Sequence, residues 1–498
     1  MLFNSLHFLV FFPIVLLVYF CIPKNIRYIW LLAASYYFYM CWNAKYAVLI
    51  LFSTVITFLS GVAIDWVKQH NWEEKKAIFY KKGILTASFV LNLGVLVYFK
   101  YANFFLDNIE RILGACHIEL NVPVVDVLLP VGISFYTFQA LSYTMDVYRG
   151  DIYAEKNFFR YALFVSFFPQ LVAGPIERSK NLLKQLTVPA KFDYEKAREG
   201  FLLMLWGFFL KIVVADRIAV FVDTVYGDYV TYTGWYLVVA TVLFAFQIYC
   251  DFYGYSTIAT GAAQLLGIQL MTNFETPYLS LSVKEFWRRW HISLSSWFRD
   301  YLYFPLGGSK KGTIRKYINI MIVFLVSGLW HGARWSFVIW GGLNGIFQLI
   351  GDLLKPVKDW LVKVFGFNRS SLAHKLICAL VTFALVDFTW IFFRATGYKE
   401  AVEIVKGIFT AANPGVFWDG SLYNCGLDSK NFGVMLISIG ILLFVDICNY
   451  LGVKVRNVIL RQDIWFRWIF IAFSICAILL FGMWGSAFDE ASFIYFQF

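Results

Sequence analysis

The sequence predicts an all-α protein that crosses a membrane many times, and three observations predict this class. First, 60% of the residues are hydrophobic and only 15% are charged, with a mean hydropathy of +0.64. Second, apolar segments of helical length recur from one end of the chain to the other, as in polytopic helical membrane proteins. Third, the alternating pattern of an outer-membrane barrel is absent from the sequence. Residues 1–498 are therefore expected to form a single membrane domain.

The apolar segments predict about 11 to 13 membrane helices. We expect these helices near 6–22, 28–42, 47–66, 84–100, 128–148, 158–173, 200–222, 235–253, 316–331, 334–352, 373–393, 432–450 and 464–484. Two further segments are expected to be re-entrant or interfacial: 254–272 is only moderately apolar, and 283–304 alternates aromatic and basic residues at helical spacing. Ser282 followed by Glu285 predicts a capping box at the start of the second segment.

The net charge of +11 is interpreted as a signal of membrane topology. Basic residues gather in the polar breaks near 24–27, 68–82, 178–198, 284–316, 355–375 and 454–461. The positive-inside rule places these breaks in the cytoplasm, and the breaks poorer in basic residues outside it. Both chain termini are therefore expected on the extracytoplasmic side. Nucleic-acid binding is not predicted, because the charge follows the membrane loops.

The eight cysteines are scattered through the chain without a C-x-x-C pair or a histidine at ligand spacing. Most lie within apolar runs, where cysteine behaves as a small hydrophobic residue. The sequence therefore predicts neither a structural metal site nor a disulfide framework.

Two histidines are the first candidates for a functional site, because an ionisable side chain at membrane depth costs about 2.5–3.5 kcal/mol or more. His291 lies in the second of the interfacial segments, four residues after Trp287. It either shares an inward helix face with that tryptophan or is simply a polar residue of an interfacial helix. His331 ends an apolar run between Gly328 and Gly332. It either faces a cavity as an acid or base, or packs with its ring bonded to a backbone carbonyl.

Five sequence blocks in order through residues 129–345 carry a resemblance to a known family. The blocks are LPVGISFYTF at 129–138, FPQLVAGPI at 168–176, YCDFYGYS at 249–256, FWRRWHISLS at 286–295 and LWHG at 329–332. With them the chain resembles the membrane-bound O-acyltransferase family, in its bacterial branch of alginate O-acetylation and D-alanyl transfer proteins. The resemblance implies helices around a central tunnel that joins a cytoplasmic donor to an extracytoplasmic acceptor. The chain departs from the branch at Thr257, where an acidic residue is expected, which puts a carboxylate role there in doubt.

The resemblance also implies roles for individual residues. His331 corresponds to the catalytic base and His291 to the second active-site histidine, which would orient the donor or bind the developing oxyanion. Residues assigned to the substrate tunnel are Trp287, Trp290, Trp330, Asp251 and Ser295. For any one of these tryptophans taken alone, ordinary aromatic packing is the better explanation. Asp251 either pairs with an arginine such as Arg288 or with a histidine, or accepts a structural hydrogen bond.

The ending of the chain, FIYFQF at 493–498 within the tail 485–498, resembles the Phe-x-Tyr-x-x-Phe ending found with D-alanyl transfer proteins. That resemblance implies a relay in which Tyr495 accepts the acyl group as an aryl ester. A phenol has a pKa near 10 and leaves more readily than an alkyl alcohol, so the ester stays reactive. An extracytoplasmic partner, a transferase resembling SGNH hydrolases, would then pass the acyl group to a polysaccharide. Without the resemblance, an aromatic belt residue in a C-terminal tail is the better explanation of Tyr495.

The expected donor is a cytoplasmic thioester, and no tightly bound cofactor is expected. Arg288, Arg289, Lys310 and Lys311 would attract the phosphates of acetyl-CoA or an acidic acyl carrier protein, although such runs are also typical of solvated topogenic loops. The resemblance implies polysaccharide O-acetylation at a bacterial inner membrane. D-alanyl transfer from a carrier protein to teichoic acid is the alternative within the family. A polysaccharide or lipid transporter and a non-catalytic scaffold are alternatives from other classes, although the sequence lacks the internal repeats typical of transporters.

Overall fold

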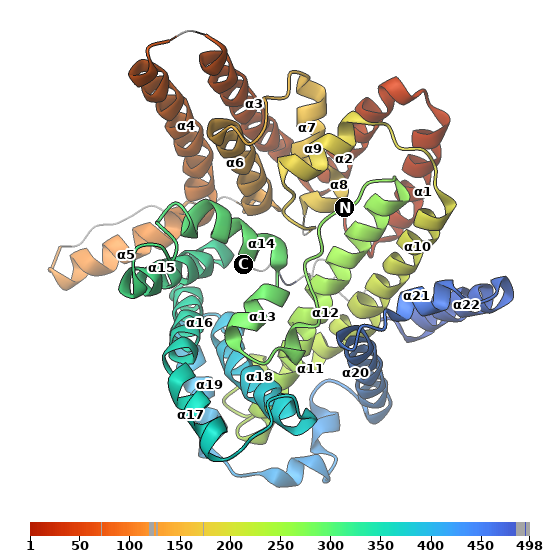
Figure 1. Ribbon diagram of the computed structural model, residues 1–498. Helices are drawn as coiled ribbons and strands as arrows, with labels where there is room; N and C mark the ends of the chain where they lie inside the picture. Colours follow the sequence, from red (N-terminus) through yellow and green to blue (C-terminus); the bar gives the residue numbers. More distant parts are fainter. Residues whose placement is uncertain (71, 119–123, 126–127, 173, 485–493, 495–498) are drawn as a thin grey trace. The chain divides into compact units, whose positions relative to one another are not determined.

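The computed structural model describes residues 1–70, 72–118, 124–125, 128–172, 174–484 and 494 (Figure 1). Every regular element in these ranges is a helix, which confirms the all-α class. Contacts within the chain define two compact units, and each is described by itself. The first comprises Met1–Met204 and Ile258–Met271, and the second comprises Leu205–Thr257 and the described residues from Thr272 onward. The single membrane domain expected from the sequence stays a prediction.

The first unit contains the N-terminal helices of the chain. They are α1 (Leu6–Cys21), α2 (Arg27–Asn43), α3 (Ala47–Gln69), α4 (Glu74–Leu96), α5 (Ala102–Ala115), α6 (Ile133–Arg149), α7 (Phe158–Ser166), α8 (Phe168–Leu171) and α9 (Ser179–Thr187). Two further helices, α10 (Tyr194–Phe208) and α12 (Trp235–Leu265), contribute residues to both units. Helix α3 packs against both α4 and α6 (Figure 1). Gly132 precedes α6 with φ +76°, and a Cβ there would lie 2.7 Å from the carbonyl oxygen of Leu171, so only glycine suits this entry.

The second unit contains both histidines of interest. Its elements are the π-turn η4 (Phe209–Ala215), α11 (Asp216–Gly227), α13 (Val283–Arg289), α14 (Ile292–Phe298), α15 (Thr313–His331), α16 (Trp335–Leu353), α17 (Lys355–Val364), α18 (Leu372–Arg394), α19 (Tyr398–Thr410), α20 (Ser429–Tyr450), α21 (Val455–Leu460) and α22 (Ile464–Phe481). Helix α16 packs against α15 on one side and α18 on another (Figure 1). These three helices carry most of the aromatic side chains around the site described below.

Seven helical segments in the described part of the chain are long and apolar enough to cross a membrane, or eight if the bent pair α16 and α17 is one span. They are Lys24–Gln69, Glu74–Ala115, Trp235–Leu265, Thr313–His331, Leu372–Arg394, Ser429–Tyr450 and Ile464–Phe481. The sequence predicted more separate spans for two reasons. The predicted spans 28–42 and 47–66 both lie within the one segment Lys24–Gln69, and other apolar segments are broken into shorter pieces. Between residues 158 and 171, for example, α7 and α8 are separated by a break at Phe167. The chain is a multi-pass membrane protein.

Of the two segments expected to be re-entrant or interfacial, 254–272 differs from the prediction. Helix α12 continues without a break to Leu265, so much of 254–272 extends a membrane helix. Its moderate hydropathy follows from its surroundings, because the helix faces protein. A Cβ at Gly254 would lie 2.8 Å from the carbonyl oxygen of Gly207, which shows how closely the backbones approach. The segment 283–304 is not one helix, because it breaks at His291 between α13 and α14.

The capping box predicted at the start of α13 is confirmed. The hydroxyl of Ser282 accepts a hydrogen bond from the amide of Glu285 at 3.2 Å. The carboxylate of Glu285 reaches back and accepts from the amide of Leu281 at 2.9 Å. Two amides at the helix start are thereby satisfied by side chains, which fixes where α13 begins.

Glycines set the packing of α15 against α16, and this yields a first prediction. A Cβ at Gly341 on α16 would overlap the carbonyl oxygen of Phe324 on α15. Because the obstacle is backbone, Gly341→Ala is expected to destabilise the protein by about 1–3 kcal/mol. Gly351→Ala on the same helix is the control, since nothing lies within 4 Å of its added Cβ. Tryptophan fluorescence during thermal unfolding in detergent measures both, and equal transition temperatures would refute the tight contact.

Candidate functional site

His331 lies at the C-terminal end of α15, as the sequence predicted, and its ring is enclosed by aromatic side chains. The ring centroid lies 4.9 Å from Trp330, 5.1 Å from Trp340 and 5.3 Å from Phe393, each nearly edge to face. The residue is 5% exposed. His331 lies in the last turn of the helix, where the backbone carries partial negative charge.

His291 occupies the break between α13 and α14 in a left-handed conformation, with φ +45° and ψ +53°. Such a conformation costs a residue other than glycine about 1–3 kcal/mol and persists only where the surrounding structure enforces it. The His291 ring is 1% exposed and lies 4.6 Å from the ring of Phe252 on α12. The expectation that His291 shares a helix face with Trp287 is wrong, because the helix ends before residue 291.

Asn273, which the sequence analysis did not identify, holds the left-handed turn in place. Its backbone carbonyl accepts from the amide of Ile292 at 3.0 Å, and its side-chain oxygen accepts from the hydroxyl of Ser293 at 2.7 Å. The Asn273 side chain also donates to the hydroxyl of Ser256 on α12 at 3.0 Å. All three polar side chains are buried, where such bonds are strong and costly to lose. Asn273 therefore ties the turn that carries His291 to α12.

Trp330 brings the two histidines into one group. Its ring centroid lies 6.1 Å from His291 and 4.9 Å from His331. Trp287 belongs to the same aromatic set, because its ring lies 5.5 Å from Trp340, which in turn contacts His331. Trp287 also donates from its indole nitrogen to the Asn344 side chain at 3.3 Å. The structure thus gathers side chains from α13, α15, α16 and the His291 turn around two imidazoles.

Trp290 and Ser295 lie close to the histidine group but take part in packing. Trp290 is buried and stacks on Phe286 at 5.3 Å, with Trp390 at 5.1 Å on α18. The hydroxyl of Ser295 donates to the carbonyl of Trp290 at 3.2 Å, across the break at His291. Both contacts stabilise the geometry of the turn.

Asp251 belongs to a buried cluster of charges on α12, η4 and α11. The ammonium of Lys211 lies 2.7 Å from a carboxylate oxygen of Asp216 and 2.7 Å from Oδ1 of Asp251. The other oxygen of Asp251, Oδ2, accepts a hydrogen bond from the backbone amide of Ile494 at 2.7 Å. Phe252, the neighbour of Asp251 in sequence, contacts the His291 ring. The cluster is therefore next to the histidine group along α12.

The prediction that Asp251 pairs with Arg288 or with a histidine is wrong, because Asp251 pairs with Lys211. Arg288 is exposed on α13, whereas Lys211 is buried on η4, forty residues before Asp251. A buried lysine in the apolar run 200–222 was the signal that the sequence analysis missed, because such a charge needs a partner. Tyr495 lies outside the described residues, although Ile494 beside it in the sequence is described.

The basic residues proposed to bind the donor are placed as follows. Arg288, Lys310 and Lys311 are exposed. Arg289 is half-buried, pairs with Glu285 at 2.9 Å and lies over the ring of Tyr450 at 5.3 Å. Arg289 therefore already has a carboxylate partner, whereas the other three present their charge at the surface.

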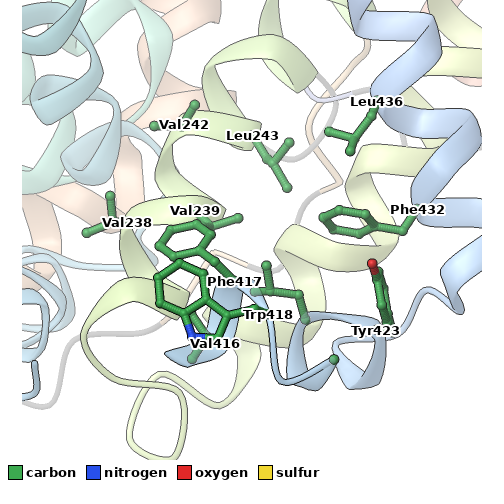
Figure 2. Close-up of a pocket in the computed structure, with 12 residues that line it drawn as sticks. Val238, Val239, Val242, Leu243, Val416, Phe417, Trp418, Tyr423, Phe432 and Leu436 are labelled. Atoms are coloured by element: carbon green, nitrogen blue, oxygen red, sulfur yellow. The ribbon is translucent and has the colours of Figure 1, made fainter. Parts of the chain in front are cut away.

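A separate cavity of about 600 Å³ lies among α12, the segment around 416–423 and α20 (Figure 2). It is lined by Val238, Val239, Val242, Leu243, Val416, Phe417, Trp418, Gly420, Leu422, Tyr423, Phe432 and Leu436. None of these side chains is an imidazole or a carboxylate, and Figure 2 shows hydrocarbon and aromatic groups facing the space. The cavity offers no general base, so the candidate acid–base site is the histidine group.

Comparison with known proteins identifies a family and several relatives that this chain resembles. Residues 152–361 match the model of the membrane-bound O-acyltransferase family. The chain is 37% identical over 416 residues to a probable alginate O-acetylase of Azotobacter vinelandii, covering 82% of this chain and 78% of the relative. It is 32% identical to a peptidoglycan O-acetyltransferase of Helicobacter pylori, covering 82% and 80%. It is also 25% identical to a teichoic acid D-alanyltransferase of Bacillus subtilis, covering 57% and 73%.

Proposed function

The chain belongs to the membrane-bound O-acyltransferase family and is an O-acyltransferase, and from this premise we propose that it moves an acetyl group from a cytoplasmic thioester towards an extracytoplasmic polysaccharide. The observation that carries the proposal is the set of ring contacts that joins His291, Trp330 and His331. Ile494 is bound to Asp251, the residue before Phe252, and the Phe252 ring contacts that of His291. An acyl transfer needs a base for the attacking hydroxyl and an enclosure that excludes water. The two imidazoles and their aromatic surroundings supply both requirements.

In the proposed first step, His331 takes the proton from the phenol of Tyr495 as its oxygen attacks the thioester carbonyl. The carbon–sulfur bond then breaks, the new aryl ester remains on Tyr495, and the thiolate leaves with the proton from His331. The position of His331 in the last turn of α15 stabilises the transient imidazolium by about 0.3–1 kcal/mol. In this proposal a ring N–H of His291 stabilises the oxyanion of the tetrahedral intermediate. Trp287, Trp330 and Trp340 exclude water that would hydrolyse the thioester.

In the proposed second step, a partner enzyme outside the cytoplasm takes the acetyl group from Tyr495 and passes it to the polysaccharide. Relatives named as an alginate O-acetylase and a peptidoglycan O-acetyltransferase support a polysaccharide acceptor. The proposed partner is a transferase resembling SGNH hydrolases, which would attack the aryl ester with its own serine. The charge distribution supports an inner-membrane protein whose two termini face outward.

Acetyl-CoA is the proposed donor, with Arg288, Lys310 and Lys311 exposed where they would attract its phosphates. A carrier protein loaded with D-alanine is the second candidate donor. The relative named as a teichoic acid D-alanyltransferase supports this alternative, but at lower identity and coverage than the O-acetylases. The acetyl donor is therefore the better supported of the two.

The purified full chain incubated with acetyl-labelled coenzyme A tests the relay. We expect wild type to retain an ester label that hydroxylamine removes, and Tyr495→Phe to retain none because it lacks the nucleophile. Tyr423→Phe is the control, since Tyr423 lines the separate apolar cavity. Full labelling of Tyr495→Phe would exclude the tyrosyl ester. Labelling from a D-alanyl carrier protein, with none from acetyl-CoA, would favour the alternative donor.

A further inference from the structure

Ile494, the last residue that the structure describes, is bound to the buried carboxylate of Asp251. This carboxylate takes no part in the proposed acyl transfer. Oδ2 of Asp251 accepts the backbone amide of Ile494 at 2.7 Å, across 243 residues of sequence. Ile494 is 2% exposed, and so is Asp251. A hydrogen bond to an ionised acceptor is about twice as strong as one between neutral groups. Because water is excluded here, the amide and the carboxylate satisfy each other.

The two other charges of the cluster fix this carboxylate in one orientation. Lys211 bridges Asp216 and Oδ1 of Asp251, and the three side chains are 2%, 3% and 3% exposed. One ammonium shared by two carboxylates leaves negative charge on the cluster. With Oδ1 directed at Lys211, Oδ2 remains directed at the amide of Ile494. The cluster therefore combines a fixed geometry with an excess of acceptor charge.

We propose that Asp251 is a positioning residue that clamps the C-terminal segment by the main-chain N–H of residue 494, with Lys211 and Asp216 orienting the carboxylate. This deepens the proposed function, because the residue after the clamped amide in the sequence is Tyr495. A hydrogen bond to a main-chain N–H fixes which residue of the C-terminal segment lies at Asp251, and it also contributes to how tightly that segment binds. Since Phe252 beside Asp251 contacts the His291 ring, the same turn of α12 serves both the clamp and the histidine group.

Digestion of the purified full chain by carboxypeptidase Y, which also releases proline, followed by intact-mass measurement, tests the clamp without any acyl donor. In wild type we expect digestion to stop before Ile494. In Asp251→Asn we expect digestion past Ile494 to be at least about tenfold faster, because a neutral amide replaces the ionised acceptor. Asp446→Asn is the matched control, since Asp446 is another buried carboxylate and bonds to Tyr249 at 2.9 Å. Its digestion should match that of wild type.

A second pair of variants leaves the charged cluster untouched. Ile494→Pro removes the donated N–H, whereas Ile494→Ala removes more of the side chain but keeps the N–H. We expect the proline variant to lose protection and the alanine variant to remain nearer to wild type. Protection unchanged in both Asp251→Asn and Ile494→Pro would overturn the clamp. The clamp and the relay can also be told apart. If protection from digestion depends on Asp251 but the chain never takes up an acyl label, the clamp is upheld and the relay is refuted.

Discussion

Replacing His331 with alanine is expected to reduce acyl transfer about 10²- to 10⁴-fold, the usual contribution of a general base. His331 is enclosed by Trp330, Trp340 and Phe393, so no neighbour among these rings can take over proton transfer. The rate of label transfer from acetyl-CoA to the purified full chain measures the effect. Loss of the base should lower the rate of the chemical step, with little change in the donor concentration that gives half-maximal rate.

Two further variants separate proton transfer from packing. His331→Gln retains a polar side chain of similar reach but cannot accept the proton as imidazole does, so its rate should fall as far as that of His331→Ala. His374→Ala is the matched control, since His374 is half-buried on α18 and interacts with Cys378. Transfer by His374→Ala should equal that of wild type. A His331→Gln protein with nearly full activity would contradict the role of general base.

The sequence was sufficient to predict the elements that depend on local pattern. Long apolar runs predict membrane helices because each must satisfy its own backbone groups in lipid. The capping box at Ser282 and Glu285 is also local, as is the end of a helix at His331. These features depend on residues within one or two turns of each other.

The features that the sequence did not predict depend on partners distant in the chain. The left-handed turn at His291 follows from hydrogen bonds to Asn273, which lies eighteen residues earlier and outside the helix pattern. The pairing of Asp251 with Lys211 joins two helices, and no periodicity connects residues forty apart. The histidine residues were identifiable as candidates because charge at membrane depth is costly, and the same argument applied to Lys211 would have identified the cluster.

Lys211→Met is expected to destabilise the protein by about 3–5 kcal/mol, because it leaves two buried carboxylates without their shared cation. Lys211 lies 2.7 Å from both Asp216 and Asp251, and all three side chains are nearly inaccessible. Thermal unfolding in detergent measures the loss. Lys316→Met is the matched control, because its pair with Asp352 at 2.6 Å is 28% and 23% exposed. Such a half-exposed pair contributes about 0–1 kcal/mol, so this variant should remain close to wild type.

The double variant Lys211→Met with Asp216→Asn tests whether charge is the cause. Removing one carboxylate together with the ammonium relieves repulsion between the two acids, so the double variant should be more stable than Lys211→Met alone. A loss as small as that of Lys316→Met would contradict this role of the buried charges. Without Lys211, Oδ1 of Asp251 is no longer held in place, so Oδ2 is no longer directed at the Ile494 amide. Lys211→Met should therefore also lose the protection of Ile494 against carboxypeptidase, which links the stability of the cluster to the binding of the C-terminal segment.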